Sequence, residues 1–166
     1  DDPVYPAADF RTEWGPIFHR GRLDGSARVL VIGQDPAAHE SIARRILVGE
    51  AGQRTQGFMK RLGVEREYVM VNAYLYSVYG QPPRGSLDDV QPQIDEDRFR
   101  WLEALTVDTE VRAAVSFGGL ARELWERWQK HQGGDAGDLP FVALPHPTMP
   151  DAASTALAID SATSPR

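Results

Sequence analysis

The sequence predicts an α/β protein in three layers, in which helices cover both faces of a central four-stranded parallel sheet. Strand-length apolar runs recur along the chain, and helical patterns lie between them. Strands that alternate with helices pair in parallel, because each connection crosses a face of the sheet. The 166 residues fit one domain, 1–166. The four apolar runs are 28–33, 68–73, 111–117 and 140–144.

Three of the segments around these strands show helical periodicity. The second of them follows the acidic stretch 95–97, which is typical of a helix N-terminus. The loop 77–93 carries Pro and Gly too densely for a regular element, so we expect a long functional loop there. The apolar residues that share a helix face are Ile42, Ile46 and Leu47; Trp101, Leu102 and Leu105; and Leu120, Leu124 and Trp128.

Acidic side chains outnumber basic ones by 24 to 18, which gives a formal net charge of −6. Because a chain of this charge has no broad basic surface, any contact with DNA has to be local. The basic side chains between 44 and 66 form such a patch or belong to a solvated helix face. The sequence has no cysteine, which excludes disulfides, cysteine-based zinc sites and thiolate-bound iron–sulfur clusters.

No apolar run reaches the roughly 20 residues of a membrane helix, and 1–10 lacks the pattern of a secretory signal. We therefore expect a cytoplasmic protein with no membrane partner. The histidines have no spacing typical of a metal site, so we expect neither a metal nor another cofactor. These histidines are His19, His39, His131 and His146.

Polar or glycine residues stand at the end of each of the four apolar runs or directly after it. In open parallel sheets, ligands bind in the crevice beyond the carboxyl ends of the strands, so these residues are predicted to share one site. Taken singly, each also fits a helix cap, a turn or a loop. They are Gly33, Gln34 and Asp35 after the first run, Asn72 in the second, Gly118 and Gly119 after the third, and His146 and Pro147 after the fourth.

The motifs in this order resemble those of the uracil-DNA glycosylase superfamily. "GQDPA" at 33–37 is similar to its first motif, Gly-Gln-Asp-Pro-Tyr, and "HPTMP" at 146–150 to its last, His-Pro-Ser-Pro. "VMVNAYLYSV" at 69–78 looks like its uracil-reading strand, and "GQRTQGFM" at 52–59 lies where it carries a Phe that stacks on the base. The likeness covers about 28–150, and the absence of cysteine points to the cluster-free branch.

The resemblance implies hydrolysis of the bond between uracil and deoxyribose. Asp35 would then stabilise the cationic sugar and orient water, and a neutral His146 would donate to uracil O2. Asn72 would read the base edge, Phe58 would stack on the base, and Gln34 would line the pocket through its backbone. Phe58 also fits a core aromatic, since it lies among helical neighbours.

The resemblance also implies a monomer that binds uracil-containing DNA. The N–H groups at the start of the helix after the third run would hold a phosphate. The loop after the fourth run would contact the strand, with Met149 as the nearest apolar wedge. The expected DNA contacts are Gly118, Gly119, Pro147, Thr148 and Met149.

Two positions differ from the family pattern. Ala37 stands where the family has the Tyr that excludes thymine, so we expect His39 or the neighbouring loop 38–52 to take over that steric role. Gly119 replaces the Ser of the usual phosphate-binding Gly-Ser pair, which removes a hydroxyl contact.

Two other interpretations stay open. The chain is a member of the same fold that binds uracil or damaged DNA with little cleavage, although Asp35 and His146 together argue against this. Alternatively it is a small-molecule α/β hydrolase or a nucleotide-binding protein. The absence of "GxGxxG" and "GxxxxGK[ST]" weakens this last interpretation, in which Asn72 has no specific role.

Overall fold

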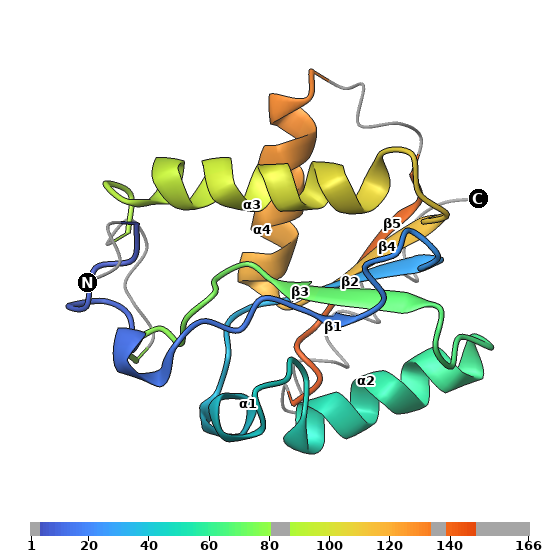
Figure 1. The fold of residues 1–166 in the computed structure, drawn as a ribbon, viewed down its shortest axis with the longest axis horizontal. Coiled ribbons are helices and arrows are strands. Elements are labelled where there is room, and N and C mark those ends of the chain that lie inside the picture. Colours follow the sequence, from blue (N-terminus) through green and yellow to red (C-terminus); the bar gives the residue numbers. More distant parts are fainter. Residues whose placement is uncertain (1–3, 81–86, 134–138, 149–166) are drawn as a thin grey trace, which may run out of the picture.

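A five-stranded sheet forms the centre of the computed structural model, which describes residues 4–80, 87–133 and 139–148 (Figure 1). The strand order is β1-β3-β2-β4-β5, and the last four strands pair in parallel as predicted. β1 adds a short antiparallel edge on β3 that the sequence did not predict, because two residues show no periodicity. The strands are β1 (Arg20–Gly21), β2 (Val29–Gly33), β3 (Tyr68–Asn72), β4 (Ala113–Phe117) and β5 (Phe141–Leu144).

Helices cover both faces of the sheet, which confirms the three predicted layers. In Figure 1, α3 and α4 lie on one face, and α1 and α2 lie on the other. No helix in the described ranges is long and apolar enough to cross a membrane. The helices are α1 (Ala38–Ala43), α2 (Gly49–Arg61), α3 (Gln91–Thr106) and α4 (Gly119–His131), together with the short 3-10 helix η1 (Thr12–Trp14).

The central strand β2 shows how the two apolar layers arise. Side chains alternate across a strand, so Leu30 and Ile32 join the cluster with Trp125 of α4. Val31 points to the opposite face and joins the cluster with Met59 of α2. All five side chains are almost completely buried. A strand buried on both faces reads as a continuous apolar run, which is why the sequence revealed it.

The first predicted helical pattern is wrong, and the other two are confirmed. α1 ends at Ala43, and Ile42 is 82% exposed, so it does not share a buried face with Ile46 and Leu47. These two residues are buried in the connection between α1 and α2. Arg44 and Leu47 have positive φ angles of 53° and 50°, which interrupt the helical path.

The connection between α1 and α2 is fixed by contacts from two elements. Arg20 of β1 donates through Nη1 to the carbonyls of Leu47 at 2.8 Å and Ile46 at 3.2 Å. Gly52 of α2 lies so close that an added Cβ would come 1.8 Å from the Leu47 oxygen. The left-handed Leu47 is therefore held by a hydrogen bond on one side and by the helix backbone on the other.

We predict that Gly52→Ala and Gly57→Ala, both in α2, change stability in opposite directions. The new methyl at 52 meets the Leu47 carbonyl, so the free energy of unfolding should fall by about 1–3 kcal/mol. At 57 nothing lies within 4 Å of an added Cβ. Replacing this glycine in the helix interior should therefore raise the free energy of unfolding by about 0.5–1 kcal/mol. Urea denaturation measures both, and a Gly52→Ala protein as stable as wild type would contradict the close packing.

Candidate active site

The carboxyl ends of the four parallel strands converge on one small cavity of about 50 Å³. Four residues predicted for the site line it: Gln34, Asp35, Asn72 and His146. Gly33 and Ala37, which belong to the first motif that the sequence placed at the site, also line it. The sequence did not single out the other three as pocket residues: Glu40, Leu47 and Phe117. Phe117 is the last residue of β4. Because ligands bind at the carboxyl ends of parallel strands, the sequence could have predicted Phe117 as a pocket residue.

Asn72 enters the cavity because Gly33 lies opposite it in the sheet. The two residues are partners in the parallel register of β2 and β3. A Cβ at position 33 would come 2.3 Å from Asn72 Oδ1, so only glycine leaves room for this amide. The Asn72 residue is 3% exposed, and its side chain has no hydrogen-bond partner among the residues that the structure describes. A buried amide without a partner is available to a ligand.

Asp35 is a half-buried carboxylate with one hydrogen bond to the backbone. Its Oδ2 accepts the N–H of Val78 at 3.1 Å. Burial raises the pKa of Asp35 to about 6, and the nearby Glu40 carboxylate adds to this rise, while the Val78 bond opposes it. Asp35 is therefore ionised above this pH, in a setting where the charge is costly.

The Val78 donor is held in place by the N-terminal segment. Phe10 and Val78 form an antiparallel bridge, and Arg11 donates its backbone N–H to the Ser77 carbonyl at 2.8 Å. The guanidinium of Arg11 lies between the rings of Trp14 and Tyr79, at 4.7 and 4.3 Å from the ring centroids. This packing fixes the backbone amide that Asp35 faces.

His146 follows β5 and is also half-buried. Burial lowers the pKa of its imidazole, and the Glu40 carboxylate opposes that shift, so the neutral ring prevails at pH 7. The backbone N–H of Thr148 donates to Nδ1 at 3.4 Å, and the Thr148 hydroxyl lies 2.9 Å from the same atom. With Nδ1 as acceptor, the neutral ring carries its proton on Nε2.

The loop that carries His146 is tied to α2. Arg54 donates to the Pro147 carbonyl at 2.9 Å and pairs with Glu50 one turn earlier at 2.7 Å. The placement of the imidazole thus depends on a helix that lies almost a hundred residues earlier in the chain. Met149, the predicted wedge, lies outside the described residues.

Gln34 and Gly118 join β2 to the start of α4. The Gln34 side chain accepts the N–H of Leu120 at 3.3 Å, and a Cβ on Gly118 would come 2.5 Å from the Gln34 Cδ. Gly118 donates its own N–H to the Leu144 carbonyl at 2.9 Å. The predicted phosphate contact through the Gly118 amide is therefore corrected, since the fold uses that donor. Gly119 is exposed, and its N–H has no acceptor among the described residues.

Phe58 is not where the sequence placed it. It lies on α2, half-buried, with its ring edge against Phe117 at a centroid distance of 6.0 Å, and Phe117 lines the cavity in its stead. The other apolar wall is Leu47, from the connection that the sequence assigned to a helix. His39, proposed as the substitute gate, is exposed, lies beside Gly49 and does not line the cavity.

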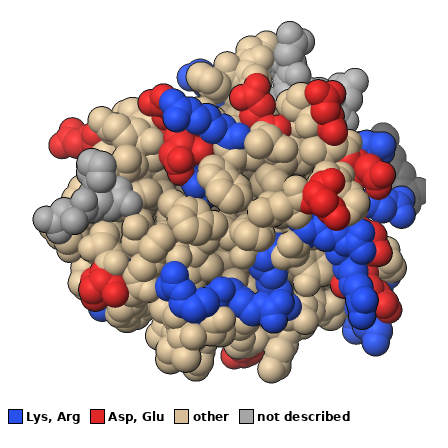
Figure 2. All heavy atoms as spheres, in the orientation of Figure 1, with Lys and Arg blue, Asp and Glu red and all other residues tan. Residues whose placement is uncertain are grey.

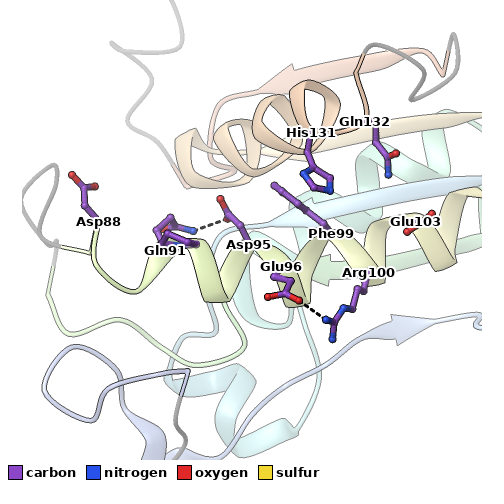
Figure 3. A pocket seen from close by; sticks show the side chains of 10 residues that line it. Asp88, Gln91, Asp95, Glu96, Phe99, Arg100, Glu103, His131 and Gln132 are labelled. Atoms are coloured by element: carbon purple, nitrogen blue, oxygen red, sulfur yellow. Dashed lines mark hydrogen bonds and ion pairs between the residues drawn. The ribbon is translucent and has the colours of Figure 1, made fainter.

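A larger cavity of about 710 Å³ lies between α3 and the end of α4 (Figure 3). Four of its ten lining residues are acidic, and several of the polar groups in its walls are already paired. Gln91 and Arg127 bind Asp95, and Arg100 binds Glu96. None of the residues at the four strand ends lines it. The chemistry of the side chains, rather than the volume, therefore favours the smaller cavity as the active site.

Fold and pocket together define a three-layer α/β protein with a carboxylate, a buried amide and a neutral imidazole at the carboxyl edge of its sheet. The model of the Uracil DNA glycosylase superfamily matches residues 20–152, and the chain belongs to this superfamily. The matched range includes every residue that lines the smaller cavity. A comparison with curated proteins finds no match.

We predict that Asp35→Asn stabilises the protein at pH 7 but not at pH 4. The folded pKa of Asp35, about 6, lies above its value in the unfolded chain, so wild type loses stability as pH rises between the two values. Asparagine does not titrate, and after an allowance for solvent screening the gain at pH 7 should be about 1–2 kcal/mol. Thermal unfolding at both pH values measures it.

Asp24→Asn serves as the control. Hydrogen bonds from Ser26 lower the pKa of Asp24, so its carboxylate adds stability above the unfolded pKa, and the substitution should destabilise at pH 7. An Asp35→Asn protein that loses stability at pH 7, as Asp24→Asn does, would contradict the costly environment of Asp35.

Proposed function

We propose that the protein is a monofunctional DNA glycosylase that flips uracil out of DNA and hydrolyses its N-glycosidic bond, leaving an abasic site. The observation that carries this proposal is the buried amide of Asn72, which has no partner in the described part of the chain and shares one cavity with Asp35 and His146. Membership of the superfamily supports a glycosylase, and the amide supplies the specificity for one base.

In the proposed reaction, the bond between C1′ and N1 breaks and its electron pair leaves with the base. A positive charge develops on the deoxyribose and a negative charge on uracil. The ionised Asp35 stabilises the cation and orients the water that adds to C1′. His146, neutral and protonated on Nε2, donates a hydrogen bond to uracil O2 as charge gathers there.

Asn72 can donate to O4 of uracil and accept from N3–H. Cytosine presents the reverse pattern, because its N4 is a donor and its N3 an acceptor. Leu47 and Phe117 provide apolar surfaces for the two faces of the ring. A cavity of about 50 Å³ requires these walls to move apart as the base enters, at the time when base stacking in the DNA is lost.

The DNA strand would run along the carboxyl edge of the sheet. The exposed N–H of Gly119 at the start of α4 and the loop at Pro147 and Thr148 are the proposed phosphate contacts. Figure 2 shows Lys and Arg side chains mainly on the lower half of the visible face, where α1 and α2 cover the sheet. Most acidic side chains lie above them, over α3, so a local basic region exists on an acidic protein.

The experiment that tests this function is incubation with a uracil-containing oligonucleotide, followed by alkali. Strand cleavage at the uracil supports the glycosylase. A gel shift without cleavage would instead support a protein that binds uracil or damaged DNA. Absence of both cleavage and a gel shift would favour a small-molecule enzyme on the same fold. The same oligonucleotide with cytosine at that position is the control.

We predict that Asp35→Asn lowers the rate of uracil release by at least about 10²-fold while DNA binding persists. A charge used mainly in the transition state affects turnover more than affinity. His146→Ala should have a similar effect, since one donor to a developing anion contributes about 2.7–4 kcal/mol. Single-turnover release and a gel shift measure the two quantities. Rates within a few-fold of wild type would remove the substituted residue from the mechanism.

We predict that Leu47→Ala lowers kcat/KM for uracil release at least about fivefold, because the base loses an apolar wall worth 1 kcal/mol or more. Phe58→Leu, which changes a ring outside the cavity, should stay within about twofold of wild type. Rates are compared at a temperature at which unfolding curves show both variants folded. A larger loss for Phe58→Leu than for Leu47→Ala would restore the stacking role to Phe58.

A further inference from the structure

A segment before β1, residues 9–17, lies beside residues 75–79, which follow β3. Phe10 and Val78 form an antiparallel bridge with one backbone hydrogen bond on either side of it. In such a pair the backbone groups of the bridged residues point away from each other, so the Val78 N–H points away from the N-terminal segment and toward Asp35. The two bonds run from the Arg11 N–H to the Ser77 carbonyl, at 2.8 Å, and from the Tyr79 N–H to the Asp9 carbonyl, at 2.9 Å.

The side chain of Arg11 joins the same two segments. Its guanidinium lies 4.7 Å from the ring centroid of Trp14, in the N-terminal segment, and 4.3 Å from that of Tyr79, the residue after Val78. Both distances are within the range of cation–π attraction. Among the described residues Arg11 forms no ion pair, so no carboxylate competes with the rings for its charge. Arg11 therefore holds the backbone at Val78 against the N-terminal segment.

The Val78 N–H is the one donor to the Asp35 carboxylate among the described residues. A hydrogen bond of this kind favours the charged form, so it holds the pKa of Asp35 below the value that burial alone would give. The proposed reaction needs this charge and needs it directed at the sugar. Three other titratable groups lie near Asp35, namely Glu40 of α1, Tyr74 after β3 and His146 after β5.

We propose that Arg11 is a positioning residue, which acts on Asp35 through the Val78 N–H. This inference rests on the proposed function, in which the ionised carboxylate faces the deoxyribose. Without the guanidinium, the backbone at Val78 is held less firmly and its N–H leaves the carboxylate more often. Asp35 then binds a proton more readily and is directed less well at C1′. Arg11 touches neither the base nor the sugar in this account.

Arg11→Met tests the inference, because it keeps much of the packing of the stem and removes the charge. Uracil release is measured at saturating enzyme between about pH 5 and 8. The acid limb of the profile should move up by at least about 0.5 pH unit, since complete loss of a hydrogen bond to a charged group would move it by about one unit or more. The rate at high pH should fall at least about threefold, because the carboxylate is less well oriented.

Two further substitutions separate the charge from other effects. Arg11→Lys keeps a cation over the rings but loses the flat stacking of the guanidinium, so its acid limb should lie between those of wild type and Arg11→Met. Arg112→Met removes an exposed arginine just before β4, at the opposite edge of the sheet, and should match wild type.

A pair of substitutions at Tyr79 tests the same contact should Arg11→Met fail to fold. Tyr79→Leu removes one of the two rings and should move the acid limb up, as Arg11→Met does. Tyr79→Phe keeps the ring and should stay close to wild type. Folded Arg11→Met and Tyr79→Leu proteins with the acid limb of wild type would overturn the inference. So would weaker DNA binding with an unchanged profile, which would make Arg11 a DNA contact.

Nuclear magnetic resonance provides a readout that needs no activity. In wild type, the backbone amide resonance of Val78 should follow the titration of Asp35, and in Arg11→Met the midpoint should rise while the amplitude falls. A Val78 resonance that ignores this titration would overturn the inference. Absence of uracil release by wild type would instead contradict the proposed function, while a raised midpoint in Arg11→Met would still support the link from Arg11 to Asp35.

Discussion

The parallel pairing of β2 with β3 and β4 is the interaction on which the site depends. Its register places Gly33 opposite Asn72, and the missing side chain at Gly33 is what admits the Asn72 amide to the cavity. The same pairing sends the chain out of β2 at Asp35 and out of β4 at Phe117, on one edge of the sheet. A shift of the register by one residue would turn every strand side chain to the opposite face.

The cavity gathers groups that are costly in a folded protein, and neighbouring contacts keep them in place. Burial raises the pKa of Asp35 to about 6 and lowers the pKa of His146, so both shifts oppose the charged forms. Val78 and Thr148 supply backbone N–H donors that orient the carboxylate and the imidazole. Stability lost in the cavity is offset by the apolar clusters on both faces of the sheet.

The sequence predicted the parts of the fold and site that follow from simple periodicity. Strands buried on both faces are continuous apolar runs, so β2 was evident, and Asp35 was found because it follows that strand. Leu47 was misassigned because its left-handed conformation depends on Arg20 and Gly52, which are distant or look unremarkable in the sequence. Phe58 was misplaced because its stacking role rested on the resemblance, whereas its helical neighbours had also allowed a core aromatic, which is closer to its packing against Phe117. The place of Glu40 in the cavity wall could be seen only from the packing around it.

The central claim is that uracil binds in the small cavity at the strand ends, although a larger cavity lies between α3 and α4. Nuclear magnetic resonance of the labelled protein during titration with free uracil tests this most directly. The account predicts that the side-chain amide of Asn72 and the ring of His146 shift, while Phe99 and His131, which line the larger cavity, do not. Shifts confined to Phe99 and His131 would contradict it.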